Sequence, residues 1–414
     1  MANTFHTLLK DSRLMKLWAA QGVSTFGNML TFLAIPILVY EETGSKAALS
    51  LTIFFGGVPQ IIVGSFAGAL VDRLDRRVIM VLGDVLRGLV MVPILFISGS
   101  WLIPTIYAVV AFKSLFGSFF QPAMSSVIPS LVQRDQLISV NSLFTFSFMT
   151  LQFLSPLVGA WLLGMIGIRM VLLIDIGSFI ISALLIAWTA VPAHEVRHPK
   201  PLSMESLVED IREGLHFIGG SKILKIMLLT GIICMLGQGF ISPVWLPYIV
   251  EYLNEPKEKF GILVSMQGLG CIVGTIIIML VGVRKKASVK GLYMFFLAGS
   301  GITIFMQITT QKFYIFLIWG TLVGVFLAAR NVAHSTLIQH ATEARMLGRV
   351  NSSFGILRQA AMLAAVLMVG LISQWVSTRF LFILAAFLWL IGTLQGAIRM
   401  AFVPEPHVEK GEQP

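Results

Sequence analysis

Six ionisable side chains lie inside long apolar runs of the sequence, and they are its first candidates for chemistry. An ionised group in hydrocarbon costs several kcal/mol unless it faces a partner or a watery cavity, so such residues commonly serve function. Two of the six are acids, which carry protons when desolvation raises their pKa, and four are bases. They are Asp84, Arg87, Lys113, Asp175, Arg330 and Arg358.

The composition places these charges in a membrane protein. The chain of 414 residues is 56% hydrophobic and only 12% charged, with a mean hydropathy of +0.87, whereas a soluble domain carries about 25% charged residues. Its two cysteines, Cys234 and Cys271, lie in apolar runs, where a thiol packs as a small hydrophobic group. No disulfide framework is predicted.

Twelve apolar runs are long enough to cross about 30 Å of hydrocarbon as helices. They predict an all-α membrane protein with twelve transmembrane helices. The expected spans are Leu17–Tyr40, Ala47–Val71, Val78–Ile97, Leu102–Ala123, Leu137–Gly164, Ile168–Val191, Ile223–Val250, Phe260–Val281, Val289–Ile308, Phe313–Leu337, Val350–Ser373 and Phe380–Phe402.

The basic residues of the predicted loops indicate an orientation. Of the 30 Lys and Arg, twenty fall on the side of the N-terminus, six on the other side and four inside the runs. Because loops rich in Lys and Arg stay in the cytoplasm, both termini are expected there. This asymmetry accounts for the net charge of +10, so the expected partner is the lipid bilayer and no nucleic acid is predicted.

The two halves of the chain look like copies related by a shift of 209 to 211 residues. A nearly constant offset across five helices predicts a parallel repeat, six helices plus six, in two pseudo-symmetric bundles. The matching positions are Lys16 with Lys225, Pro36 with Pro247, Gly64 with Gly274, and Val140-Asn141-Ser142 with Val350-Asn351-Ser352.

The repeat divides the chain into four parts. The first bundle is expected at residues 1–191 and the second at 223–403, joined by a polar linker at 192–222. Apolar residues recur at helical spacing within the linker, which predicts an amphipathic helix on the cytoplasmic face. The polar tail, 404–414, is expected to be disordered.

A polar break separates the second and third runs, with five charges in residues 72–77. Its pattern resembles motif A of the major facilitator superfamily, although Asp75 stands where that family has a small residue. The resemblance implies the major facilitator fold, with Asp72 latching the two halves together against the start of the eleventh helix while the cavity faces out. The matching residues are Gly68, Asp72, Arg73, Arg76 and Arg77.

Two further stretches resemble exporters of that superfamily. Residues 155–160 (SPLVGA) are similar to the Gly-Pro-x-x-Gly-Gly signature of drug and metabolite exporters, with Pro156 and Gly159 matching; an ordinary helix kink is the alternative interpretation. Residues 112–129 are similar to the branch that contains macrolide-efflux proteins and the enterobactin exporter. Lys113 replaces the arginine usual in that branch, which keeps the charge but loses the planar fork.

The resemblance suggests roles for the charges inside the helices. Lys113 lies about 11 residues, or ~16 Å, from the outer end of its run, near the midplane where such transporters hold substrate. Asp84 and Asp175 are the acids available to carry protons. Simpler roles stay open, because Asp84 and Arg87 one turn apart can neutralise each other, and Asp175 can cap a helix or pair with Lys113.

The two remaining arginines, Arg330 and Arg358, fall in the cytoplasmic half of the second bundle. They are expected to line an inner vestibule or to hold a gate.

Enzyme motifs are rejected. The segment from His194 to His198 has the H-E-x-x-H spacing of zinc sites, but Pro192 and Pro199 leave no room for a stable helix and no third ligand is evident. The sequence shows neither a Walker-type phosphate loop nor a serine nucleophile elbow. We therefore predict no enzymatic activity, no metal site and no cofactor.

The resemblance implies a secondary active transporter that exports a bulky hydrophobic or amphipathic small molecule, such as a drug, macrolide or siderophore, by proton antiport through alternating access. The 30 Phe and 20 Met suit a cavity that re-packs around varied shapes. A lysophospholipid flippase, a nutrient importer of the same fold and a non-transporting membrane sensor are the alternatives. We expect a monomer in the bacterial inner or plasma membrane.

Overall fold

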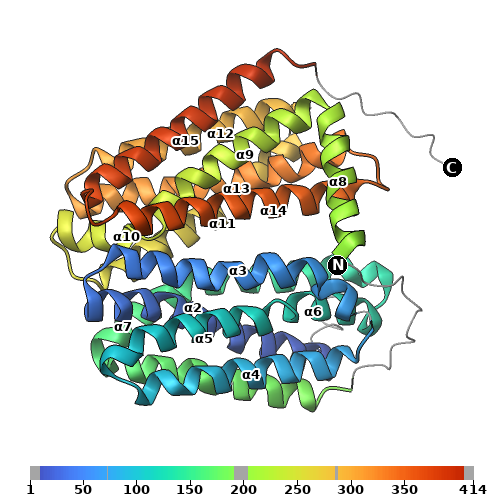
Figure 1. The fold of residues 1–414 in the computed structure, drawn as a ribbon. Helices are drawn as coiled ribbons and strands as arrows, with labels where there is room; N and C mark the ends of the chain where they lie inside the picture. Colours follow the sequence, from blue (N-terminus) through green and yellow to red (C-terminus); the bar gives the residue numbers. More distant parts are fainter. Residues whose placement is uncertain (1–9, 72, 191–203, 285–287, 405–414) are drawn as a thin grey trace. The chain divides into compact units, whose positions relative to one another are not determined.

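The secondary structure is helical throughout the part of the chain that the structure describes, with no strand there (Figure 1). Contacts divide the chain into two compact units: the first holds Met1–Leu202 with Pro256–Ser265, and the second holds Ser203–Glu255 with Met266–Pro414. The predicted fold class is confirmed. The computed structural model describes residues 10–71, 73–190, 204–284 and 288–404.

Some of the predicted features lie outside the described residues. They are Asp72 of motif A, the H-E-x-x-H segment, the first part of the linker and the tail from residue 405.

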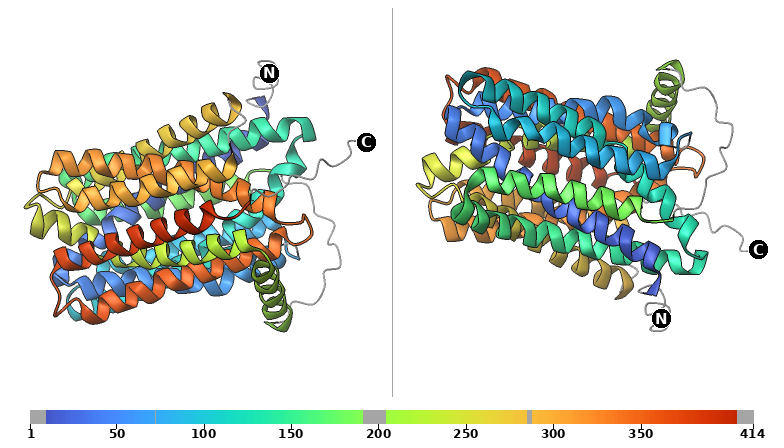
Figure 2. Two further views of the ribbon diagram at one scale, coloured as in Figure 1. Left: turned by 90° about the horizontal axis from the view of Figure 1, so that it is seen from above. Right: turned by 90° about the horizontal axis from the view of Figure 1, so that it is seen from below.

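The first unit is a bundle of long helices that run alongside one another (Figures 1 and 2). Its elements are α2 (Ser12–Thr43), α3 (Lys46–Val71), α4 (Arg76–Phe96), η1 (Gly99–Trp101), α5 (Leu102–Gly117), α6 (Phe120–Leu131), η2 (Arg134–Gln136) and α7 (Leu137–Ala187).

Helix α7 consists of two arms that reverse direction at Gly167, whose φ of 76° lies in the left-handed region that glycine adopts freely. Two contacts to α2 show the reversal: Trp18 Nε1 donates to Ser147 Oγ at 2.8 Å, and Lys16 Nζ donates to the carbonyl of Trp188 at 3.4 Å. Residues 147 and 188 therefore lie at the same end of α2. The two predicted spans, ending at Gly164 and starting at Ile168, are these two arms.

The second unit begins with the helix expected in the linker, α8, and continues with the helices of the second repeat (Figure 1). Its elements are α8 (Met204–Gly220), α9 (Lys222–Ile241), α10 (Trp245–Pro247), the π-helical turn η3 (Tyr248–Tyr252), α11 (Lys259–Arg284), α12 (Val289–Ile308), α13 (Phe313–Ala341), α14 (Leu347–Ile372) and α15 (Thr378–Ala401). The start of α11, up to Ser265, packs with the first unit.

Two of the predicted spans are interrupted by proline. Helix α9 ends at Ile241 before Pro243, because proline has no N–H to continue the helical hydrogen bonds. The short α10 passes at Pro247 directly into η3. The span expected at 102–123 divides into α5 and α6, and α6 starts at Phe120 with Pro122 in its first turn, where no N–H is needed.

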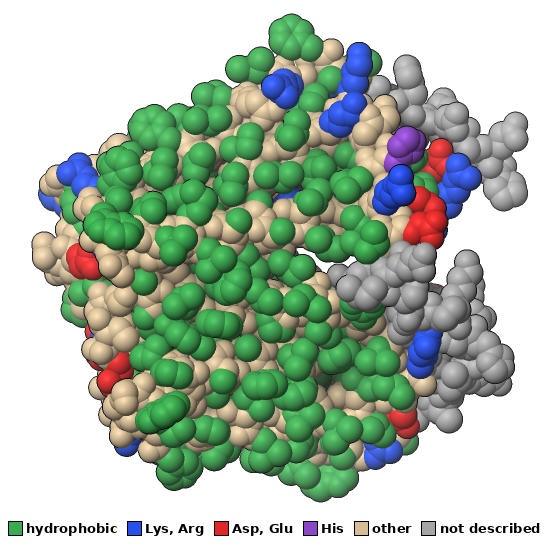
Figure 3. All heavy atoms as spheres, viewed as in Figure 1, with side chains coloured by type: hydrophobic (Ala, Val, Ile, Leu, Met, Phe, Trp, Pro, Cys, Tyr) green, Lys and Arg blue, Asp and Glu red, His purple; other side chains and the backbone are tan. Residues whose placement is uncertain are grey.

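Length and composition suit these helices to a bilayer. Among the described residues, eleven helical stretches are long and apolar enough to cross a membrane, and one of them, α7, contains two crossings. Each of the twelve predicted spans therefore has a helix. In Figure 3, hydrophobic side chains cover most of the face shown while charged ones gather toward the helix ends, and side chains such as Leu89 and Trp161 are exposed on the helix flanks.

Polar caps account for the starts of several helices. Asp75 accepts hydrogen bonds from the backbone N–H groups of Arg77 and Val78, at 2.8 and 3.3 Å, at the start of α4. The acid that departs from motif A is thus an N-cap. Asp11 caps α2, and its hydrogen bond with the Arg13 side chain lowers the pKa of Asp11. The other side-chain caps are Ser221 for α9, Ser288 for α12 and Ser377 for α15.

The core of the first unit consists of two apolar clusters at different depths. Along α4, Met80 belongs to one cluster and Met91 to the other. Asp84 and Arg87 lie between them in the sequence of the helix, and both are buried. This pair therefore lies between the two apolar clusters along α4.

Candidate functional site

The first buried ion pair joins Arg87 to Asp84 one turn away on α4. The other carboxylate oxygen of Asp84, Oδ2, accepts a hydrogen bond from Ser182 Oγ on α7 at 2.6 Å. The guanidinium also donates from Nε to the carbonyl of Gly83 at 3.2 Å. With Asp84 fully buried and Arg87 5% exposed, each charge needs its partner, because breaking a buried pair leaves an uncompensated charge.

The second buried pair joins two helices. Lys113 Nζ on α5 lies 2.6 Å from Asp175 Oδ2 on α7. Thr31 on α2 donates to the same oxygen, and Ser178 Oγ lies 3.3 Å from Oδ1. Two simpler roles were left open for Asp175, a helix cap and a partner of Lys113. The structure shows Asp175 paired with Lys113 and places it inside α7, away from either end of the helix.

The ring of Phe179 connects the two pairs. The Arg87 guanidinium carbon lies 4.7 Å from its centroid and Lys113 Nζ lies 5.1 Å from it, within the range of cation–π attraction. Asp175, Phe179 and Ser182 follow one another at i, i+4 and i+7 on one face of α7. This face therefore collects both pairs into one buried network, which we call the ionic network.

The backbone of α2 approaches α7 closely beside the ionic network. A Cβ on Gly27 of α2 would lie 2.9 Å from Ser178 Cβ and closer still to an Asp175 oxygen. Only glycine allows α2 to approach this part of α7. The approach also brings Thr31, one turn further along α2, within reach of Asp175.

A cavity of about 670 Å³ opens inside the first unit, and Arg87 forms part of its wall. Its lining mixes polar groups with large apolar ones, and Lys113 is not among its lining residues. The lining comes from four further helices: Gln21, Ser24, Thr25 and Asn28 of α2, Gly117 of α5, Phe120, Gln121, Met124, Ser125, Ile128 and Pro129 of α6, and Leu137, Asn141, Phe144, Thr145 and Phe148 of α7.

Sequence reasoning missed these polar residues, although their spacing carries a signal. Gln21, Ser24, Thr25 and Asn28 recur at i, i+3, i+4 and i+7 within an otherwise apolar run, so they share one helix face. A polar stripe of this kind within a membrane span indicates a face turned away from lipid. The candidates predicted inside the spans are charged residues or match a family motif, and neither criterion detects uncharged amides and hydroxyls.

The basic residues of motif A hold the α3–α4 turn to the rest of the first unit. Arg76 Nη1 donates to the carbonyl of Ser126 in α6 at 3.0 Å, and Arg77 Nη2 donates to the carbonyl of Ala187 at the end of α7. The backbone N–H of Arg73 bonds to the carbonyl of Leu70 at 3.1 Å. Gly68 is exposed near the end of α3.

The exporter-type motif lies at a tight helix contact. A Cβ on Gly159 would lie 3.0 Å from Leu30 Cδ2 and 3.2 Å from Leu33 Cδ2, both on α2. Pro156 is buried, and α7 continues through it without interruption. A Cβ on Gly261, in the part of α11 that packs with this unit, would lie 2.7 Å from the carbonyl oxygen of Pro156. The motif therefore serves close packing.

The two arginines of the second unit converge in a different setting. Arg330 on α13 and Arg358 on α14 both line a small void that α9 and α12 complete. The Arg330 guanidinium carbon lies 5.1 Å from the ring of Trp389, and its Nη2 donates to Asn331 Oδ1 at 3.2 Å. No acid faces them from the helices that form the void. We call these two residues and the side chains around the void the arginine cluster.

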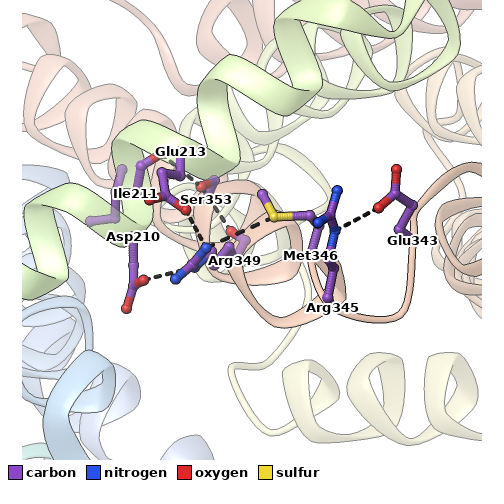
Figure 4. A network of polar contacts seen from close by, with 8 residues as sticks. All are labelled: Asp210, Ile211, Glu213, Glu343, Arg345, Met346, Arg349 and Ser353. Atoms are coloured by element: carbon purple, nitrogen blue, oxygen red, sulfur yellow. Dashed lines mark hydrogen bonds and ion pairs between the residues drawn. The ribbon is translucent and has the colours of Figure 1, made fainter. Parts of the chain in front are cut away.

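Helix α8 is tied to the start of α14 by a second set of charges. Arg349 Nε lies 2.8 Å from Asp210 Oδ1, and its Nη1 pairs with Glu213 (Figure 4). Ser353 Oγ also reaches the carbonyl of Ile211 at 3.3 Å. The three charged side chains are 40 to 52% exposed, so these ion pairs lie at the surface and differ from the buried pairs of the first unit.

No group of three or more His, Cys, Asp or Glu among the described residues is placed to hold a metal ion.

The chain matches the model of the Major Facilitator Superfamily over residues 17–233 and 227–414. It is 25% identical over 382 residues to the uncharacterized MFS-type transporter YfiS of Bacillus subtilis, covering 89% of each chain. It is 24% identical over 377 residues to macrolide efflux protein A of Streptococcus pyogenes, covering 89% of this chain and 91% of that one. It is 23% identical over 340 residues to the enterobactin exporter EntS of Shigella boydii, covering 80% and 78%.

Solved structures share the fold at low identity. The nucleoside transporter NupG aligns with a TM-score of 0.74 at 9% identity, covering 93% of this chain and 99% of that one. A bacterial homologue of the iron transporter ferroportin aligns with a TM-score of 0.70 at 14% identity, covering 94% and 97%. At these identities the likeness concerns the fold alone.

Proposed function

The chain belongs to the Major Facilitator Superfamily and is a multi-span membrane transporter, and from this premise we propose that it exports an amphipathic small molecule in exchange for protons. The export direction is supported by relatives named for efflux, among them macrolide efflux protein A and the enterobactin exporter. Motif A and the count of basic residues support an orientation with both termini in the cytoplasm.

The observation that carries the proposal is the cavity of about 670 Å³ in the first unit, with Arg87 in its wall. Amides and hydroxyls from α2 and α7 face it beside rings such as Phe144 and Phe148. Ligand sites are concave and mostly apolar, with a few polar groups that orient the ligand. A lining of this kind suits a molecule with both apolar and hydrogen-bonding parts.

Proton coupling is assigned to the ionic network. Asp84 and Asp175 are the only acids in the described helices α2 to α7 that are fully buried. When either carboxylate takes up a proton, it loses its negative charge and releases its attraction for Arg87 or Lys113. The released cation must then find another partner or water, because an unpaired buried charge is costly. Protonation of Asp84 would thus change the interactions of Arg87, which forms part of the cavity wall.

Efflux can be tested in cells with and without the gene. We expect the gene to raise resistance to a subset of hydrophobic antibiotics or siderophores. The cells are exposed to a panel of hydrophobic antibiotics and siderophores. If cells with and without the gene were equally sensitive to every compound, with the protein present in the membrane, the proposal would be contradicted.

Coupling can be tested with the purified protein in liposomes carrying a pH-sensitive dye, with a compound from that panel as substrate. We expect wild type to move protons against substrate flux. Asp175→Asn should retain substrate binding and abolish the proton signal. The matched control is Asp135→Asn, which neutralises an exposed acid in the η2 turn. Proton flux unchanged in Asp175→Asn would refute the role of this carboxylate.

A further inference from the structure

The arginine cluster is built from four helices of the second unit. Arg330 and Arg358 line its void together with Thr230 of α9, Tyr293 of α12 and His334 of α13. A Cβ on Gly231 of α9 would lie 3.1 Å from Arg358 Cδ. The absence of a side chain at that position lets the α9 backbone lie directly against the arginine stem.

The charge of this cluster has no counter-charge on the long helices around it. Helices α9, α11, α12, α13, α14 and α15 contain not one Asp or Glu between Lys222 and Ala401. The acids nearest in sequence lie outside these helices, such as Glu251 in η3 and Glu343 between α13 and α14. Two guanidinium groups, one of them only 6% exposed, therefore share a low-dielectric site without an acid on any helix that surrounds them.

Three hydrogen-bonding atoms of the cluster are also without a partner among the described residues. Among the described residues, no hydrogen bond or ion pair engages the Arg358 guanidinium, and its Nε is buried without a partner. The same holds for His334 Nε2 and Thr230 Oγ1, which line the same void. Buried polar groups are normally hydrogen-bonded, so several of them unsatisfied around one void indicate a missing ligand.

We propose that the arginine cluster binds the anionic group of a ligand, a carboxylate, phosphate or sulfonate, between Arg330 and Arg358. As an assignment of substrate class, this rests on the proposed function: the exported molecule carries a negative charge besides its apolar body. Guanidinium groups recognise such oxyanions through charge-assisted hydrogen bonds.

The size of the void limits what enters it. Its volume is about 10 Å³, which is room for roughly one water-sized group. An oxygen of the anion fits there and the body of the ligand does not. The exposed side chain of Asn331, which contacts Arg330, marks the open side toward which the body extends.

The test uses the full-length protein in phosphatidylcholine nanodiscs and two fluorescent probes. One is 8-anilinonaphthalene-1-sulfonate, and the other is the uncharged N-phenyl-1-naphthylamine, which lacks the sulfonate. Binding to empty nanodiscs is subtracted. We expect Arg358→Gln and Arg330→Gln each to weaken binding of the sulfonate about tenfold and to change binding of the neutral probe less than twofold. The sulfonate affinity of Arg358→Lys should lie between those of wild type and Arg358→Gln, since lysine keeps the positive charge but lacks the planar guanidinium.

The matched control is Arg399→Gln, which removes one exposed arginine from the last turn of α15 and should leave both affinities unchanged. Repeating the titration of wild type and Arg358→Gln in phosphatidylglycerol nanodiscs distinguishes ligand sources. The negative bilayer repels the sulfonate equally from both proteins, so loss of the difference between them would assign the site to a lipid headgroup phosphate. Unchanged sulfonate affinity in both glutamine variants, or equal loss of both probes, would overturn the site. If the gene conferred no resistance in the efflux test but the glutamine variants still lost only sulfonate binding, the proposed function would be refuted and the anion site would stand.

Discussion

The two units treat buried charge in opposite ways. In the first, each buried base has its own acid, Arg87 with Asp84 and Lys113 with Asp175, and hydroxyl groups complete both carboxylates. In the second, Arg330 and Arg358 lie together and no helix around them supplies an acid. Repeats that share a fold therefore differ in electrostatics: the first pairs each of its bases with an acid, whereas the second leaves two arginines with no acid on the helices around them.

The largest expected effect follows from breaking a pair in the first unit. Asp84→Asn leaves the Arg87 guanidinium buried without a counter-charge, and we expect it to lower stability by about 3 to 5 kcal/mol. Thermal unfolding of the full-length protein in detergent measures the change. The double variant Asp84→Asn/Arg87→Gln should recover part of the loss. Equal stability of the single and double variants would show that the two side chains do not interact.

An opposite effect is expected in the second unit. Arg358→Met removes a partly buried charge that no acid on the surrounding helices compensates, so it should raise stability by about 1 kcal/mol in the absence of ligand. Arg87→Met, the matched change in the first unit, should lower it. The same thermal unfolding assay measures both. Destabilisation by both variants would mean that the arginine cluster is compensated like the ionic network, and the contrast between the units would fail.

Paired glycines extend the contrast to packing. Gly27→Ala places a Cβ 2.9 Å from Ser178 Cβ and against Asp175, which should cost about 1 to 3 kcal/mol and disturb proton coupling. Gly231→Ala meets only the flexible stem of Arg358, at 3.1 Å, and should cost less than about 1 kcal/mol. Unfolding midpoints of the two variants provide the comparison. A larger loss for Gly231→Ala would contradict the expectation that the contact at Gly27 is the tighter of the two.

The smallest effect is expected at the surface attachment of α8. Arg349→Gln removes the ion pairs with Asp210 and Glu213 and should cost about 0.5 to 1 kcal/mol, an effect that shrinks as salt is added. Arg345→Gln is the control, because its pair with Glu343 is more exposed, with Arg345 at 81%, and should cost nothing measurable. A cost for Arg349→Gln that persists in high salt would argue for a buried role.

Much of the fold follows from local rules. The twelve spans were predictable because a helix that crosses hydrocarbon must be long and apolar whatever it packs against. Only the interruptions were missed, at Pro243 and ahead of Pro122, where the apolar pattern continues although the backbone hydrogen bonds do not. The reversal at Gly167 matches the gap left between the two spans predicted around it.

The candidate site was predictable in part. The six charges were identified because an ionised group in an apolar run is conspicuous, and the Asp84–Arg87 pair was anticipated because both lie on one helix turn. The pairing of Lys113 with Asp175 stayed one option among several, since it joins residues 62 apart. The cavity's amides and hydroxyls escaped notice, because residues such as Asn28 and Asn141 are unremarkable until neighbouring helices bring them together.

The sequence alone therefore determined the class of the protein, its membrane spans, its repeat and the six charged residues inside the spans. These features depend on the free energy of moving each segment from water into hydrocarbon, which can be judged for one segment without the others. Which charge meets which partner was decided only by tertiary structure. Gly27 lets α2 approach α7, Phe179 stands between two cations, and α9 lies against Arg358. Such contacts depend on how helices distant in sequence pack, and no property of a single helix specifies them.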